Sequence, residues 1–189
     1  MVEPLPVQKF ATDNQPMHKY WIVTALLTLG LLQGCSPALN WRDVRSAGTP
    51  LLALFPCKPE EGQRDIALGA QTLHMTLLGC QAQDATFSLV YADARALGPV
   101  GEFLGQWKTV TLGNIHGQAD KERPFLIKGA TVLAQSVKVE AHGSRADGAP
   151  LTAHVVWFAA GDQVFQAAVY AERLDPAAAS TFFEGLRFP

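Results

Sequence analysis

The sequence predicts an α+β domain, in which helices pack on an antiparallel sheet of about six or seven strands. Two segments that alternate apolar and polar side chains, 72–79 and 85–91, flank a short polar link and are typical of a β-hairpin. Residues 100–111 instead space their apolar side chains as an amphipathic helix does. Three further strand-like segments and a proline-capped terminal helix follow. The pattern therefore combines antiparallel strands and helices in a single domain.

The overall composition fits an ordinary globular domain. Hydrophobic residues make up 48% of the 189, and the formal net charge is −2. Because no cluster of like charge appears, the sequence argues against nucleic acid or an anionic membrane face as an electrostatic partner. The hydrophobic content, with scattered glycine and proline, also argues against a disordered chain. We expect one domain with a sizeable core.

An apolar run near the N-terminus has the form of an export signal. Met17 opens a short basic stretch, which leads into an apolar core over residues 20–32. That length suits a signal peptide, whereas a membrane-spanning helix needs about 20 apolar residues. Residues 1–16 contain three prolines and have no apolar period. We therefore expect a signal peptide over 17–34 and a mis-assigned start over 1–16, with a genuine extended leader as the alternative.

The signal peptide ends in a motif that resembles the lipobox of bacterial lipoproteins. Leu32, Gly34 and Cys35 match it, while Gln33 departs from the usual small residue. The resemblance implies diacylglyceryl transfer to the Cys35 thiol, cleavage before Cys35, and acylation of the new amine. Several acyl chains, at roughly 0.8 kcal/mol per buried CH₂, make a stable anchor. An uncleaved N-terminal anchor is the alternative.

The resemblance also implies a location. Ser36 follows the cysteine where, in the enterobacterial sorting rule, an aspartate would imply retention in the inner membrane. We therefore expect a lipid anchor in the outer membrane, facing the periplasm. Residues 35–50 are expected to be a lipidated tether, because prolines, glycine and charges break any period there. Residues 51–189 are expected to form a single periplasmic α+β domain.

The first part of the domain is predicted to consist of strands. Residues 51–56 form a short apolar run that ends at proline, which is typical of a strand. Residues 57–62 are expected to turn, and 64–68 to form a second short strand. The hairpin of 72–79 and 85–91 is expected to bury one face.

The three cysteines divide between two roles. Cys35 belongs to the cleavage site, which leaves Cys57 and Cys80 as an even pair in an exported domain. Export brings them into an oxidising compartment, where two thiols usually form a disulfide. A catalytic or metal-binding role would need Cys-x-x-Cys spacing or a nearby histidine, and neither is present. A Cys57–Cys80 bridge would tie the first strand to the hairpin turn and stabilise the fold by about 3 kcal/mol.

The period changes after the hairpin. Pro99 suits the first turn of the helix over 100–111, and Gly113-Asn114 suits its end. Residues 115–123 are polar and are expected to form a loop.

The last part of the domain is predicted to be a meander and a helix. Strands are expected over 130–141, 151–159 and 163–171, and the second of these is apolar on both faces and should be central. Gly161-Asp162 indicates a tight hairpin turn. Asp175-Pro176 indicates an N-cap that opens a terminal helix running through Leu186.

Two short motifs resemble those of exported proteins with the PsbP/Mog1-like fold. Residues 55–60, Phe-Pro-Cys-Lys-Pro-Glu, resemble their entry motif F-P-G-K-P-E, and residues 182–188 resemble their terminal F-F-x-S-L/F-R. The element order over 51–189 is similar too, and the chain looks like small uncharacterised lipoproteins of beta-proteobacteria. The resemblance implies an α/β/α sandwich and docking onto membrane assemblies or partner proteins, without shared catalysis. Fold alone does not transfer function.

The sequence contains no recognisable catalytic or metal motif. His74, His142 and His154 lie on predicted strands, but no pair has the spacing by which one element fixes a metal. No Gly-x-Ser-x-Gly motif occurs. We therefore expect no enzyme, no cofactor and no metal.

Three functions follow from these expectations. The leading one is a non-enzymatic binding or accessory domain for an envelope protein or complex. The second is small-ligand capture in a pocket between sheet and helix, lined by Trp157, Phe158, Phe165 and Tyr170, with packing alone as the other explanation of these four rings. The third is a hydrolase, which requires a strand histidine to meet a serine or carboxylate.

Overall fold

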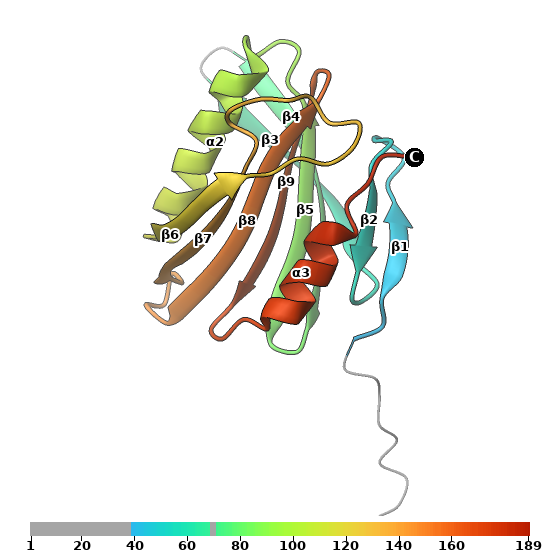
Figure 1. Ribbon diagram of the computed structural model, residues 1–189. Helices are drawn as coiled ribbons and strands as arrows, with labels where there is room; N and C mark the ends of the chain where they lie inside the picture. The colour runs from blue at the N-terminus through green and yellow to red at the C-terminus, as the bar shows by residue number, and fades with distance from the viewer. Residues whose placement is uncertain (1–38, 69–70) are drawn as a thin grey trace, which may run out of the picture. The chain divides into compact units, whose positions relative to one another are not determined.

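The computed structural model describes residues 39–68 and 71–189 and confirms the α+β class (Figure 1). The strands are β1 (Arg42–Arg45), β2 (Leu52–Phe55), β3 (Glu60–Leu68), β4 (Gln71–Ala82), β5 (Ala85–Asp93), β6 (Gln118–Pro124), β7 (Val137–Ser144), β8 (Pro150–Ala160) and β9 (Gln163–Ala171). The helices in this part of the chain are α2 (Val100–Asn114) and α3 (Pro176–Glu184).

Seven strands form one sheet in the order β3-β4-β5-β9-β8-β7-β6, with every neighbouring pair antiparallel. β1 and β2 form a separate two-stranded sheet. The large sheet therefore consists of two meanders, β3-β4-β5 and β6-β7-β8-β9, which meet where β5 pairs with β9. β8 has a partner on each side, in agreement with the central position predicted for 151–159.

Two-residue turns close two of the hairpins. Gly161-Asp162 joins β8 to β9, as its sequence predicts, with φ of 58° at Gly161. Gln83-Asp84 joins β4 to β5 with φ of 50° and 60°. Positive φ at both central residues is typical of a type I′ turn, which usually contains glycine or asparagine. The second turn therefore adopts this conformation with Asp84, which tolerates positive φ, and with Gln83, which favours it less.

The β4–β5 hairpin buries both of its faces, whereas the sequence predicts one. Leu73 and Met75 of β4 pack on the α2 side, and Phe87 and Leu89 of β5 pack on the α3 side. The register explains the difference, because Leu78 and not Leu73 shares a face with Leu89. Alternation along one strand identifies its apolar face but does not show that a second layer covers the other.

The face of the sheet opposite α2 is covered by α3 and by the β1–β2 pair (Figure 1). Phe182 of α3 packs edge-to-face on Phe55 and Phe87, with ring centroids 5.2 and 5.5 Å away. Phe158 and Phe165 stack 4.9 Å apart on the same side of the sheet. These rings form the core of the α3 side.

Both helices begin where the sequence predicts. Pro99 directly precedes α2, which ends at Asn114. Asp175 caps α3 by accepting a hydrogen bond from the Ala177 backbone N–H at 2.9 Å, and Pro176 occupies the first turn. Within the described residues, no helix is long and apolar enough to span a membrane.

Three segments differ from the sequence-based expectation. Glu60 and Glu61, expected in a turn, begin β3. The expected loop 115–123 contains most of β6, whose side chains are all exposed. The strand expected over 130–141 begins only at Val137. Edge strands are held by backbone pairing with one neighbour, so a polar edge strand such as β6 lacks the apolar period by which strands are recognised.

The folded unit also begins before residue 51, where the sequence places the domain boundary. The described residues, from Leu39 to Pro189, belong to one compact unit. β1 lies inside the expected tether of 35–50, and Trp41 and Val44 pack against the α3-side core. With only four residues, β1 is too short to show a period. The predicted signal peptide of 17–34 and Cys35, the predicted anchor residue, lie outside the described residues.

Candidate functional site

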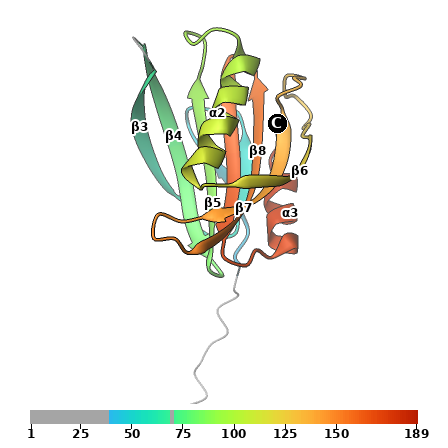
Figure 2. The same ribbon diagram turned by 90° about the vertical axis from the view of Figure 1, so that its left-hand side faces the viewer.

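An apolar groove of about 190 Å³ lies between α2 and strands β3 and β4. Figure 2 shows α2 in front of the sheet, with β3 and β4 to one side. Leu73 and Met75 of β4 line it, together with Phe103, Trp107 and Val110 of α2. The remaining lining residues are Ile66, Gln106, Thr111 and Asn114. Helix α2 thus forms one side of the groove, and β3 and β4, at the edge of the large sheet, form its base.

Apolar side chains around this groove remain open to solvent. Val110 is 58% exposed and Ile66 37%. Leu77, two residues beyond Met75 on the same face of β4, is 44% exposed. These side chains come from three different elements and gather beside one concavity. Such a surface is typical of a contact site.

A buried polar network fixes α2 to the sheet. The Gln166 side-chain oxygen on β9 accepts hydrogen bonds from Thr111 Oγ1 at 2.9 Å and from Trp157 Nε1 at 3.0 Å. Trp157 is fully buried, and its indole N–H therefore needs an acceptor inside the protein. Because Thr111 adjoins Val110, the network also positions the turn of α2 that walls the groove.

β3 borders the groove and is an edge strand of the large sheet. Its described pairing is with β4 alone, and the side chains of residues 61–66 are exposed. Glu61, Arg64 and Asp65 place charges along it. Charged edges of this kind discourage indiscriminate strand pairing. The groove is therefore the apolar part of a border that is otherwise polar.

A second, polar cleft of about 570 Å³ opens at the end of the sheet that carries the β4–β5 and β7–β8 turns. Its lining residues are Gln81, Gln83, Asp84, Thr86, Arg145, Glu172 and Arg173. Two arginines and two carboxylates balance in charge. This cleft therefore suits a polar or zwitterionic surface better than a strongly anionic one.

The three strand histidines do not converge on one site. His74 Nδ1 lies 2.6 Å from Asp65 Oδ1 at the β3 edge, while His142 pairs with Asp120 between β7 and β6. Both pairs are exposed. In residues 39–68 and 71–189, no serine completes either pair and no three His, Cys, Asp or Glu residues are placed to hold a metal. The geometry that a hydrolase triad needs is therefore not formed at either pair.

His154 and Tyr170 have pKa values shifted by burial. Partial burial of His154 lowers its pKa, while the nearby Glu140 carboxylate acts in the opposite direction. Among the residues that the structure describes, the buried Nδ1 atom of His154 has no hydrogen-bond partner. Burial on the α2 side raises the pKa of Tyr170 to about 12. Both shifts favour the neutral form of the side chain.

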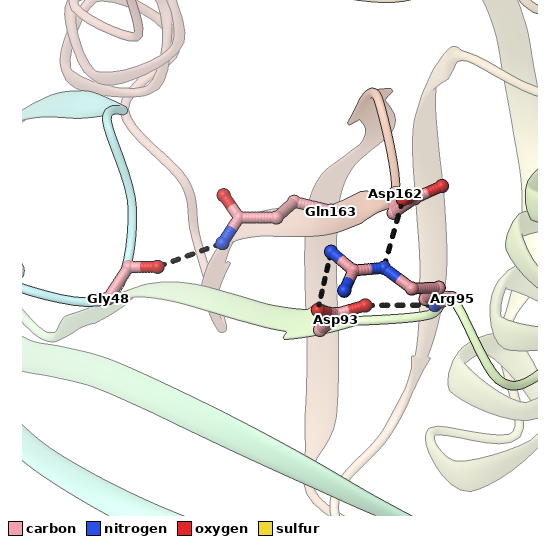
Figure 3. Close-up of polar contacts among 5 residues, drawn as sticks. All are labelled: Gly48, Asp93, Arg95, Asp162 and Gln163. Carbon is pink, nitrogen blue, oxygen red and sulfur yellow. Dashed lines mark hydrogen bonds and ion pairs between the residues drawn. The ribbon is translucent and has the colours of Figure 1, made fainter.

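Polar contacts that no sequence motif predicts join the far ends of several strands (Figure 3). Arg95 Nε donates to Asp162 Oδ2 at 3.2 Å, and the Arg95 backbone N–H donates to Asp93 Oδ1 at 2.9 Å. Gln163 Nε2 donates to the Gly48 carbonyl at 2.8 Å. These groups are exposed and tie the β8–β9 turn to the end of β5 and to the loop after β1. Their role is structural.

Cys57 and Cys80 form a disulfide, with Cα atoms 6.1 Å apart. The bridge joins the segment after β2 to β4, so it ties the small sheet to the large one. Cys35, the predicted lipidation site, lies outside the described residues.

The aromatic pocket predicted from Trp157, Phe158, Phe165 and Tyr170 is wrong. Trp157 and Tyr170 pack on the α2 side, and Phe158 and Phe165 pack on the α3 side. Neighbouring residues of a strand point to opposite faces, which separates Trp157 from Phe158. Trp107 packs against the α2-side core and also lines the groove. The apolar spacing of the helix admits either Val110 or Thr111 as its last core-facing position, and the structure buries Thr111 and leaves Val110 exposed.

Comparison with known proteins gives little further information. No family model matches the chain, and no curated protein is similar to it. Among solved structures, a Pseudomonas aeruginosa protein of unknown function, described as a candidate regulator, has a similar chain. The alignment covers 75% of this chain and 87% of that one, at 13% identity and a TM-score of 0.40. Similarity at this level carries no argument about function.

Proposed function

We propose that this protein is a lipid-anchored envelope protein whose domain binds another envelope protein. The observation that carries the proposal is the solvent-exposed apolar groove between α2 and β3–β4. The lipobox-like residues before Cys35 support the anchor, and Ser36 supports a location in the outer membrane, facing the periplasm. The role is binding and accessory rather than catalytic.

The size of the groove favours a protein partner over an enclosed small molecule. Small-molecule pockets usually measure about 300–1,000 Å³ and enclose most of the ligand. At about 190 Å³, this groove accommodates one or two apolar side chains. Exposed Ile66, Leu77 and Val110 extend the apolar surface beyond the groove itself, which suits the larger footprint of a protein.

Small-ligand capture is the second candidate, and the aromatic wall of the groove favours it. Phe103 and Trp107 lie with ring centroids 5.6 Å apart and could both contact an apolar ligand. Native mass spectrometry of protein released from membranes separates the two functions. A bound small molecule of constant mass supports this second candidate, whereas a bound protein supports the first.

We also propose that the fold is a PsbP/Mog1-like α/β/α sandwich. The placement of α2 on one face of the sheet and of α3 on the other supports this assignment. Docking onto a membrane assembly would fit that fold, although fold alone does not determine function.

Photo-crosslinking in intact cells tests the binding role. A photoreactive amino acid at Val110 should yield one discrete crosslinked protein, whereas the same residue at Thr109, one position away on the exposed side of α2, should yield much less. Val110→Glu should weaken binding of that protein at least roughly tenfold, or about 1.4 kcal/mol, while Thr109→Glu should have little effect. Equal crosslinking from both positions, or none, would contradict the proposal.

A further inference from the structure

We propose that the protein stands end-on at the bilayer, with the end of the sheet that carries the β4–β5 and β7–β8 turns against the phospholipid headgroups. The proposal rests on the lipid anchor at Cys35 proposed above. Beyond the anchor itself, it assigns the surface that faces the membrane and the distance of the groove from the bilayer.

The folded chain begins very close to the anchor. Leu39 and Trp41 pack against the α3-side core, and the Asn40 backbone N–H donates to the Pro56 carbonyl at 2.7 Å. Residues 36–38 separate Cys35 from Leu39, where the described chain begins. Four residue steps span at most about 14 Å. A tether of fifteen residues, as the sequence predicts, would let any face of the domain reach the bilayer, whereas four steps keep the start of the described chain close to Cys35.

The chain enters the domain at one particular end. Arg42 at the start of β1 opposes Phe55 at the end of β2. Cys57, just beyond, is bridged to Cys80 on β4, next to the β4–β5 turn. Because all strands of the large sheet are antiparallel, the β7–β8 turn and the β9–α3 connection lie at this same end (Figure 1). We call it the anchor-proximal end.

The chemistry of the anchor-proximal end suits a headgroup layer. Its polar cleft presents Arg145 and Arg173 beside Asp84 and Glu172. Zwitterionic headgroups carry both a phosphate and an ammonium group, and this mixed set can pair with both. The large apolar side chains that are exposed in the described residues lie elsewhere, so the end should rest on the headgroups without inserting.

The opposite end lies far from the bilayer in this orientation. β8 runs for eleven residues from one end of the sheet to the other, a length of about 35 Å at 3.3 Å per residue. Val132, 80% exposed, follows Thr131, which bridges to Ala159 at the far end of β8. Leu73 in the groove lies nine residues along β4 from Ala82, or about 30 Å. The groove therefore faces the envelope space and not the lipid.

Two fluorescent labels measure the orientation. Ala146→Cys places a label in the β7–β8 turn, and Val132→Cys places the matched control at the far end. With Cys57 and Cys80 bridged and Cys35 lipidated, the introduced cysteine is the reactive thiol. The lipidated protein is reconstituted in phosphatidylethanolamine–phosphatidylglycerol vesicles that contain a headgroup-attached quencher. Because the two sites differ in height by about 30 Å, quenching at Ala146 should exceed quenching at Val132 at least roughly threefold.

A variant with a longer tether provides a second test of the orientation. Twenty Gly/Ser residues inserted between Ser36 and Pro37 reach about 25 Å on average, and they should greatly reduce the difference between the two labels. Equal quenching at both sites in the unmodified tether would overturn the orientation while leaving the anchor in place. Failure of the wild-type protein to float with vesicles would refute the anchor itself, and the orientation with it.

Discussion

Removal of the Cys57–Cys80 disulfide should lower the free energy of unfolding of the domain by an amount that follows from the length of the loop that the bridge closes. The bridged residues are 23 apart in sequence. In the loop-entropy model a closure of that length is worth about 3.4 kcal/mol at 25 °C. The double variant Cys57→Ala/Cys80→Ala, made in a Cys35→Ala background, should lose that much free energy of unfolding. The bridge matters here because it connects the β1–β2 pair to the large sheet.

Guanidinium unfolding followed by tryptophan fluorescence measures this loss. For a chain of this length, 3.4 kcal/mol corresponds to a fall in Tm of about 7–14 °C. The unsubstituted protein treated with a reductant is the matched control and should fall by a similar amount. A loss below about 1 kcal/mol in both the variant and the reduced protein would refute the reasoning, because it would mean that the bridge does not restrict the unfolded chain.

Three further predictions concern buried polar groups. Burial raises the pKa of Tyr170 to about 12, so the unfolded state loses the phenol proton first. The free energy of unfolding should therefore fall as pH rises from 10 to 12. Tyr170→Phe should flatten this fall when the free energy of unfolding is measured against pH. Gln166→Leu leaves the donors of Thr111 and Trp157 unpaired and should cost about 2–5 kcal/mol by chemical denaturation, whereas Gln166→Glu, which retains an acceptor, should restore part of the loss. Burial lowers the pKa of His154, so the unfolded state binds the proton first as pH drops. The free energy of unfolding should therefore fall below pH 6.5. His154→Gln should remove that part of the acid dependence, as measured by Tm between pH 5 and 7.

The sequence predicts those parts of the fold that have a strong local signal. The Gly161-Asp162 turn, the Asp175 cap and the helix after Pro99 each depend on a few adjacent residues. The Cys57–Cys80 pair follows from counting cysteines in a chain that the sequence predicts to be exported. The α+β class follows from the change in apolar period along the chain.

Elements held by distant partners could not be predicted in this way. β1 is four residues long and exists because it pairs with β2, and β6 is a wholly exposed strand held by β7. The same reason explains the error on the β4–β5 hairpin, whose second face is buried by layers that come from elsewhere in the chain. Pairing of this kind has no periodic signal within the segment itself.

The candidate groove was likewise hidden from sequence reasoning. Trp107 lies on the apolar stripe of its helix, and a core position is the ordinary interpretation. It lines a groove because α2 packs beside β3, the edge strand of the described sheet, and this side of the helix stays exposed at Val110. Thr111, a polar residue on that stripe, is explained only by Gln166 on a strand 55 residues away.

Mass spectrometry of the mature N-terminus tests the central claim most directly. The protein is purified from membranes, digested, and its N-terminal peptide is analysed. A lipid-anchored protein predicts a peptide that begins at Cys35 and carries a diacylglyceryl group on sulfur and an acyl group on the amine. A peptide that begins at Met1 or Met17, or an unmodified Cys35 within an uncleaved chain, would contradict the claim and would also remove the basis for the end-on orientation.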